Sequence, residues 1–357
     1  MIKKVAIGLL IGVLLLALAF WGVPLEDVRG ALAQMNPAWL VPVALIFLYQ
    51  QAIRALRQMV MVRALVPSST YWTNLGILCM GFLCINTFPA RLGEFVRPYL
   101  LKQKEGIPMG AGFGLTFVER LLDLTATLLI LALVMTFAEL PTHQIELAGS
   151  TWDVTELGAR VAMTMLLPLG IVALGLLFFG RQVLTLSAWI HRAVTARVTW
   201  SWLDRLGRWL LGFAESFVRG LDSVRSPGRL VILVALTAAT WVGSAFMYTC
   251  LAAAFGFPEL IGFLEGLGVM VLIMLGTMAP APPGFVGVYE AAARGALALF
   301  GVHGELLSGK AIAYALVLHY WTYAVQALTA WWFFRQESEG WWALMMRALG
   351  RGGDPEQ

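Results

Sequence analysis

The residues best placed to do chemistry are three charged side chains in one short stretch of an apolar chain. Arg91, Glu94 and Arg97 lie three residues apart, so a helix would carry them along one side. Pro89 and Gly93 interrupt regular helix in the same stretch. An arginine offers a planar, two-pronged donor that matches phosphate, and backbone N–H groups at a helix start also bind anions. The stretch predicts a phosphate-binding element, against the alternative of an ordinary solvated loop.

A second charged group lies inside the apolar run Met109–Phe137. Glu119, Arg120 and Asp123 occupy it, and Glu119 and Asp123 are one helical turn apart. Charges inside a membrane are costly and usually face a partner or a wet cavity. The alternative is a structural ion pair, for example between Arg120 and Glu94.

A third stretch repeats the Pro-x-x-x-Gly spacing of the first. Pro283 and Gly287 are followed by Glu290 in strongly apolar surroundings. Two interrupted apolar segments in corresponding halves of a membrane protein point to a substrate site at an inverted-repeat interface. The alternative for Glu290 is a self-contained pair with Arg294, four residues later.

The composition is that of a polytopic membrane protein. Of the 357 residues, 59% are hydrophobic and only 13% are charged, whereas a soluble domain carries about a quarter charged residues. The three cysteines lie in apolar segments and predict neither a disulfide framework nor a metal site. No P-loop, Gly-x-Ser-x-Gly, His-Glu-x-x-His or dinucleotide-binding motif is found. We therefore expect no catalytic residue, no metal and no cofactor, and a transporter rather than an enzyme.

Apolar runs predict an all-α fold of about six transmembrane helices and two re-entrant hairpins broken by Pro and Gly. The predicted spans are Val5–Val23, Trp39–Ile53, Met109–Phe137, Ala159–Gly180, Leu230–Phe255 and Lys310–Phe334. The first hairpin covers Tyr71–Leu101, since Phe88–Leu101 is too short to span about 30 Å of hydrocarbon. The second pairs Leu260–Ala279 with Phe285–Phe300, and full crossing is the alternative to a re-entrant course there. Residues 1–335 then form one membrane domain and 336–357 a short cytoplasmic tail.

The distribution of Lys and Arg predicts which side each segment faces. Arg181–Arg229 holds eight arginines, and the positive-inside rule places it in the cytoplasm with both chain termini. Arg54 and Arg57, which follow the second span, are interpreted as the solvated flank of that span.

Two further features lie outside the charged stretches. Within 181–229, Trp202, Leu206 and Trp209 fall on one helical side and Arg205 and Arg208 on the other, which predicts an amphipathic helix on the cytoplasmic leaflet. The alternative is a helix packed on the spans. His319 stands alone in the last span and is interpreted as a hydrogen-bonded packing residue rather than a proton relay.

The charged motifs together resemble a known family. They read Asn86-x-x-Pro89-x-Arg91-x-Gly93-Glu94-x-x-Arg97, then Glu119-Arg120-x-x-Asp123, then Pro283-Gly-x-x-Gly287-x-x-Glu290. This pattern resembles the integral-membrane flippase-like family, whose best-known relatives are the transmembrane regions of lysylphosphatidylglycerol synthases, also called multiple peptide resistance factors. In the synthases this region is held to move the modified lipid to the outer leaflet. The chain ends at Gln357, soon after the last span, so we expect no aminoacyl-transferase domain.

The resemblance and the charged residues together predict translocation of an anionic phospholipid or polyprenyl-phosphate-linked lipid across a bacterial inner membrane. Arg91 and Arg97 would hold the phosphate. The remaining site residues would shape the cavity, pair the arginines or read a cationic headgroup: Glu94, Glu119, Arg120, Asp123 and Glu290.

The expected partners are membrane lipids with an anionic headgroup, with no nucleic acid. A homo-oligomer and a lipid-modifying partner enzyme are both compatible with the sequence. The alternatives are a membrane-embedded lipid-phosphate transferase and a non-transporting scaffold for a lipid-modifying enzyme.

Overall fold

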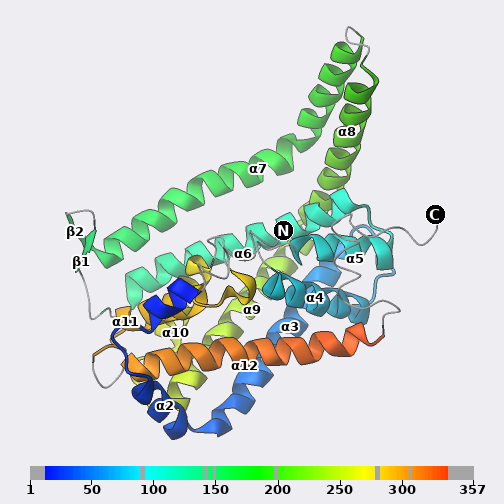
Figure 1. The fold of residues 1–357 in the computed structure, drawn as a ribbon. Helices are drawn as coiled ribbons and strands as arrows, with labels where there is room; N and C mark the ends of the chain where they lie inside the picture. Colours follow the sequence, from blue (N-terminus) through cyan, green and yellow to red (C-terminus); the bar gives the residue numbers. More distant parts are fainter. Residues whose placement is uncertain are drawn as a thin grey trace.

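The computed structural model describes residues 13–88, 93–138, 140, 144–147, 150–196, 200–277, 282–304 and 308–336. These residues form a bundle of helices with one short β-hairpin (Figure 1). The helices before the hairpin are α2 (Leu25–Gln34), η1 (Pro37–Trp39), α3 (Leu40–Val62), α4 (Tyr71–Thr87), α5 (Val96–Glu105) and α6 (Met109–Phe137). The strands are β1 (Gln144–Leu147) and β2 (Ser150–Asp153). After them come α7 (Val154–Thr195), α8 (Ser201–Leu221), η3 (Asp222–Val224), α9 (Pro227–Ala254), α10 (Phe263–Gly276), η4 (Pro283–Phe285), α11 (Val288–Leu299) and α12 (Ser308–Phe334).

Three of the described helical segments are long and apolar enough to cross a bilayer. They are Pro37–Val62, Met109–Phe137 and Pro227–Ala254. Each exceeds the roughly 20 residues that about 30 Å of hydrocarbon requires. The helical architecture of a polytopic membrane protein is thus confirmed, and α6 has the bounds that the sequence predicted for its apolar run.

The second span is longer than the sequence predicted. α3 continues past Ile53 to Val62, so Arg54 and Arg57 lie in the body of the helix rather than in a solvated flank. Arg57 is fully buried. The interpretation of Arg57 as a positive-inside flank is therefore wrong, because the carboxylates that hold its charge come from a helix distant in the sequence.

The two predicted breaks separate short helices that pack as pairs, α4 with α5 and α10 with α11. Gly93 allows the chain before α5 to pack closely on α4, because a Cβ atom there would collide with the backbone of Cys84 and Ile85. Gly284 and Gly287 have φ of 69° and 82° in the second break, a conformation that favours glycine. Pro89 and Arg91, and residues 278–281, lie outside the described residues.

The breaks also contact each other, since α4 packs against η4. A Cβ atom built at Gly284 would lie 3.9 Å from the carbonyl oxygen of Asn86. Asn86 and Phe285 both line the same cavity. The expected meeting of the two interrupted segments is confirmed for their described residues.

The basic segment 181–229 differs from the prediction in its first part. α7 is a continuous helix of 42 residues that runs through the predicted span end at Gly180 to Thr195. The predicted amphipathic helix is present as α8, and α7 and α8 lie side by side where they project from the bundle (Figure 1). Between α6 and α7 the chain forms the antiparallel pair β1–β2.

The second half of α8 packs tightly on α6, as the alternative interpretation of this helix expected. A Cβ atom at Gly110 or Gly114 of α6 would collide with the backbone of Phe213 or Phe217. Glycines four residues apart let two helix backbones approach closely in a membrane. The first half of α8 is different, since Trp202 and Trp209 are exposed.

Candidate functional site: a charged central cavity

A cavity of about 390 Å³ lies at the centre of the bundle. Its wall combines apolar and aromatic side chains with a few charged ones, as in many sites for small ligands. The charged and ionisable wall residues are Arg54, Glu94, Arg120, Asp123, Tyr248, Tyr289, His319 and Tyr323. They come from α3, the start of the α5 segment, α6, α9, α11 and α12.

Arg97 and Glu119 form a buried ion pair behind this wall. The two side chains are each 2% exposed, and Nη2 of Arg97 lies 2.6 Å from Oε2 of Glu119. The same guanidinium donates to Oε1 of Gln58 at 2.6 Å. Gly81 makes room for the pair, because a Cβ atom there would collide with the Arg97 side chain. The expected ion pair between Arg97 and a carboxylate of α6 is confirmed.

The proposed role of Arg97 as a phosphate ligand does not fit this geometry. Neither Arg97 nor Glu119 lines the cavity, and the guanidinium of Arg97 is committed to Glu119 and Gln58. A buried charge separated from its partner is destabilising by several kcal/mol. Arg97 and Glu119 therefore support the cavity wall, and a phosphate in the cavity does not reach them.

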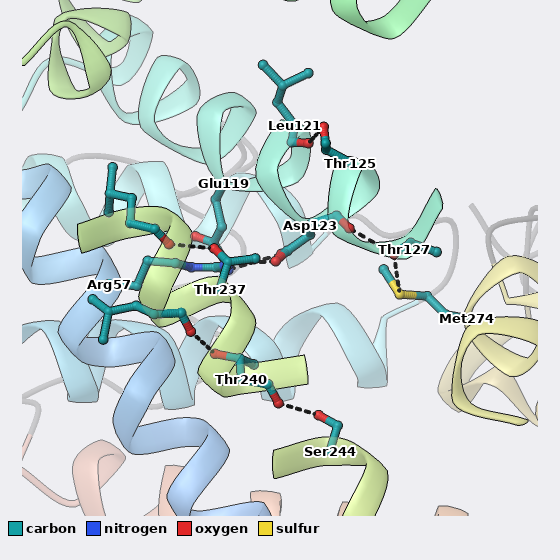
Figure 2. Close-up of polar contacts among 12 residues, drawn as sticks. Arg57, Glu119, Leu121, Asp123, Thr125, Thr127, Thr237, Thr240, Ser244 and Met274 are labelled. Atoms are coloured by element: carbon teal, nitrogen blue, oxygen red, sulfur yellow. Dashed lines mark hydrogen bonds and ion pairs between the residues drawn. The ribbon is translucent and has the colours of Figure 1, made fainter. Parts of the chain in front are cut away.

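Arg57 joins Glu119 to Asp123. Its guanidinium donates to both oxygens of Asp123, at 2.6 and 3.0 Å, and lies 3.3 Å from Oε1 of Glu119. Figure 2 shows the Arg57 side chain pointing from α3 toward these two carboxylates of α6, with Thr237 of α9 as a further acceptor at 3.0 Å. Asp123 is both a partner of Arg57 and a residue of the cavity wall.

Arg120 and Glu94 form the pair that does face the cavity. Nη2 of Arg120 lies 2.6 Å from Oε1 of Glu94, and the side chains are 38% and 23% exposed. The alternative that pairs Arg120 with Glu94 is thus confirmed. Because this pair is half-exposed, separating its partners costs much less than separating the buried pairs.

Arg54 is the arginine of this cluster that forms no ion pair with another described residue. The cluster holds four arginines and three carboxylates: Arg54, Arg57, Arg97, Arg120, Glu94, Glu119 and Asp123. Each carboxylate is paired with one of the other arginines. Among the residues that the structure describes, no carboxylate lies within ion-pair distance of Arg54, whose guanidinium stands 5.4 Å from the ring centre of Phe82. The described residues of this cluster therefore carry one positive charge in excess.

Glu290 and His319 form a separate buried pair at the cavity. Oε1 of Glu290 lies 2.7 Å from Nδ1 of His319, and its Oε2 accepts the N–H of Gly287 at 2.7 Å. Glu290 is fully buried and does not line the cavity, whereas His319 does. The alternative pair with Arg294 is wrong, because Arg294 donates to the carbonyl oxygens of Ala19 and Trp21.

Arg54 and Arg57 are the site residues that sequence reasoning assigned elsewhere. A signal was present: Gln50, Arg54 and Arg57 recur at helical spacing, and Gln51 and Gln58 add a second polar row on the same helix. A polar stripe of this length on an apolar helix indicates an interior face toward charged partners. The positive-inside rule alone does not distinguish such a stripe from a solvated helix end.

The described residues offer no metal centre. No group of three or more His, Cys, Asp or Glu side chains among them is placed to hold a metal ion. Cys79 and Cys84 are free and buried in α4.

Comparison with known proteins identifies the family. The sequence model of the lysylphosphatidylglycerol synthase TM region matches residues 5–330. A curated relative, the glycosyltransferase AglD of Haloferax volcanii, is 28% identical over 302 residues, which cover 80% of this chain and 47% of that protein. The chain thus spans about half the length of the curated relative that it matches. No solved structure matches the chain. With nearly its whole length matched, the chain belongs to the family of the lysylphosphatidylglycerol synthase TM region.

Proposed function

We propose that this protein moves an anionic lipid between the two leaflets of the membrane. The observation that carries the proposal is Arg54, which has no carboxylate partner among the described residues and lies in the wall of a cavity inside a bundle of apolar helices. An embedded charge is costly and is retained mainly at pathways for substrates and ions. A surplus positive charge there favours a phosphate group.

The cavity wall suggests how a headgroup is held. The phosphate binds the guanidinium of Arg54, and Arg120 turns from Glu94 to supply a second donor. The buried pairs of Arg57 and Arg97 keep the wall in place and stay intact. The acyl or prenyl chains remain in the bilayer, since a cavity of about 390 Å³ takes a headgroup and not the tails.

Short helices beside the cavity favour a path between leaflets. α4, α5, α10 and α11 have 17, 10, 14 and 12 residues. At about 1.5 Å per residue each is shorter than the roughly 30 Å of hydrocarbon. We propose that both pairs are re-entrant hairpins related as an inverted repeat, in a bacterial inner membrane with both chain termini in the cytoplasm.

The comparisons support a lipid-related role and leave the cargo to be proposed. The curated relative is named a glycosyltransferase, and that name describes the whole of a protein of which the match covers 47%. A polyprenyl phosphate, which carries sugars in membranes, is therefore a cargo candidate beside an anionic phospholipid. We propose that the part shared with this chain handles the lipid.

The test is transbilayer movement in liposomes that contain the purified protein. Fluorescent phosphatidylglycerol and a fluorescent polyprenyl phosphate should change leaflets faster than in empty liposomes. Arg54→Ala should slow movement by about 10- to 100-fold, because a charge-assisted hydrogen bond contributes about 1.5–3 kcal/mol. Arg54→Lys should restore part of the rate, since a point charge lacks the two-pronged donor.

Arg208→Ala is the matched control, because this arginine lies on the exposed surface of α8. Equal rates with and without the protein for both lipids would contradict translocation. Lipid-phosphate turnover under the same conditions would favour the transferase alternative, and neither activity would favour the scaffold.

A further inference from the structure

His319 is held in one tautomer by a fully buried carboxylate. Nδ1 of the ring lies 2.7 Å from Oε1 of Glu290, and the other oxygen of Glu290 is fixed by the N–H of Gly287. An ionised carboxylate only accepts hydrogen bonds, so Nδ1 carries the proton of this contact. Because His319 lines the cavity, Nε2 is the ring nitrogen available to a ligand there.

Nε2 then has two states that differ in what they bind. In the neutral ring it accepts a hydrogen bond, and in the imidazolium it donates one. A phosphate oxygen accepts hydrogen bonds and repels another acceptor. The protonated ring therefore binds a lipid phosphate, whereas the neutral ring does not.

Two aromatic rings and a carboxylate surround the imidazole ring of His319. Tyr289 and Tyr320 stack on the imidazole, with ring centres 4.4 and 4.9 Å away. Aromatic faces attract a cation, most strongly where water is excluded. Glu290 adds a full negative charge beside the ring. Among the described residues, the ion-pair partner of Glu290 is His319. The imidazolium–carboxylate pair is neutral overall, which suits a membrane interior.

Other titratable groups that face the pair come from every packed helix that lines the cavity near it. On the near side they are Tyr289 of α11, Tyr320 and Tyr323 of α12, and Tyr248 of α9. The remaining charged groups of the cavity wall are Arg54 of α3, Arg120 and Asp123 of α6, and Glu94, which precedes α5. The cavity residues of α4 and α10 carry no charge. The thiols of α4, Cys79 and Cys84, do not line the cavity. Arg294, the other charge on α11, is turned to the carbonyl oxygens of Ala19 and Trp21. Asp27 of α2 packs at Gly309, near the far end of α12.

Arg54 and His319 offer two separate positions for a phosphate in the wall of one cavity. Gln51 of α3 is hydrogen-bonded to Gln326 of α12. Arg54 lies one turn beyond Gln51 on its helix, and His319 lies two turns before Gln326 on the other. The two groups thus stand on opposite sides of this contact and bound one cavity.

We propose that His319 is a proton-dependent phosphate ligand that couples lipid movement to proton movement, an inference that rests on the proposed function. On one side of the membrane a hydronium ion gives its proton to Nε2, so that an N–H bond forms and an O–H bond breaks. The Nε2–H group binds the lipid phosphate. On the other side the lipid leaves and Nε2–H returns its proton to water. One proton and one singly charged lipid then travel together, without net charge.

The experiment uses phosphatidylcholine liposomes that hold the full chain, fluorescent phosphatidylglycerol and a pH difference across the membrane. A membrane-impermeant quencher reports how much lipid occupies the outer leaflet. The wild-type protein should enrich the lipid in the leaflet opposite the acidic side, by about tenfold per pH unit at equilibrium. The enrichment should persist when the membrane potential is clamped, because the coupled step carries no net charge.

The variants distinguish a role of the His319–Glu290 pair from general effects of a substitution on the protein. His319→Gln and Glu290→Gln should abolish the enrichment, whereas His303→Gln, a change at an exposed histidine, should keep it. Movement of lipid to an equal distribution despite the pH difference would overturn the coupling and leave the proposed function standing. No movement under any condition would overturn both. Enrichment that survives in a folded His319→Gln protein would also overturn the coupling.

A measurement on the wild-type protein does not depend on variants that fold. With ¹⁵N-labelled histidine, the Nε2 signal of His319 should report more protonated ring at a fixed pH when phosphatidylglycerol is added, since linkage between two ligands is reciprocal. The Nδ1 signal should keep its proton throughout. A His319 signal that is unchanged by pH and lipid would overturn the inference, because a purely structural histidine predicts that result.

Discussion

Arg57 and Asp123 are joined by two hydrogen bonds, of 2.6 and 3.0 Å, between α3 and α6. The arginine is fully buried, and its second contact, with Glu119, links it to the pair that Glu119 makes with Arg97. Removing one member of such a chain leaves an uncompensated charge in a dry interior. These residues therefore decide stability more than they decide ligand binding.

Arg57→Ala should destabilise the protein by about 3–5 kcal/mol, because it strands the carboxylate of Asp123. Thermal unfolding in detergent measures the loss. Replacing both partners, as Arg57→Met with Asp123→Leu, should recover most of the stability, since no buried charge then lacks a partner. A double variant that is less stable than Arg57→Ala would contradict this account.

The sequence predicts the helices of this protein better than the partners of its charges. α6 has the expected bounds because Pro108 precedes a long apolar run that favours a helix start there. The pairing of Arg97 with a carboxylate of α6 could also be expected, because both stretches carry charges that hydrocarbon does not tolerate.

Contacts between distant helices explain what could not be predicted. Arg54 and Arg57 follow an apolar run, and the same local pattern describes a solvated helix end. Only the approach of α6 separates the two cases, since it supplies two carboxylates for Arg57 and, within the described part of the chain, none at ion-pair distance for Arg54. His319 likewise looks solitary until α11 brings Glu290 to its Nδ1.

Glu94→Gln should strengthen binding of an anionic lipid, because it frees Arg120 in the cavity wall. We expect up to roughly fivefold tighter binding of fluorescent phosphatidylglycerol, since a half-exposed charge pair is worth at most about 1 kcal/mol. The melting temperature should change little. Fluorescence anisotropy with protein in nanodiscs measures the affinity.

The matched control for that prediction is Glu156→Gln, which breaks an exposed pair with Arg160 at the start of α7. Its lipid affinity should equal that of the wild type. Weaker binding in Glu94→Gln would show instead that Glu94 itself contacts the headgroup, as expected for a cationic one.

Gly93→Ala should loosen the first hairpin. A Cβ atom at this position would collide with the backbone of Cys84 and Ile85, which a side-chain rotation does not relieve. Overpacking of this kind costs about 1–3 kcal/mol or more. Gly295→Ala is the control, because a Cβ atom there meets nothing within 4 Å and alanine favours helix. Equal unfolding midpoints for the two variants would contradict the close approach of these segments.

The proposed topology predicts which engineered cysteines an impermeant thiol reagent labels from outside the cell. His303, in the exposed loop between α11 and α12, should be labelled when changed to Cys, whereas Gln103 on α5 and Arg208 on α8 should not. Cys250 is half-buried and should be changed to Ser beforehand, while Cys79 and Cys84 are buried.

Permeabilised cells should label Gln103→Cys and Arg208→Cys, which shows that both sites are reactive once reached. Labelling of Arg208→Cys in intact cells would place the α7–α8 projection outside and would contradict the cytoplasmic assignment of both chain termini.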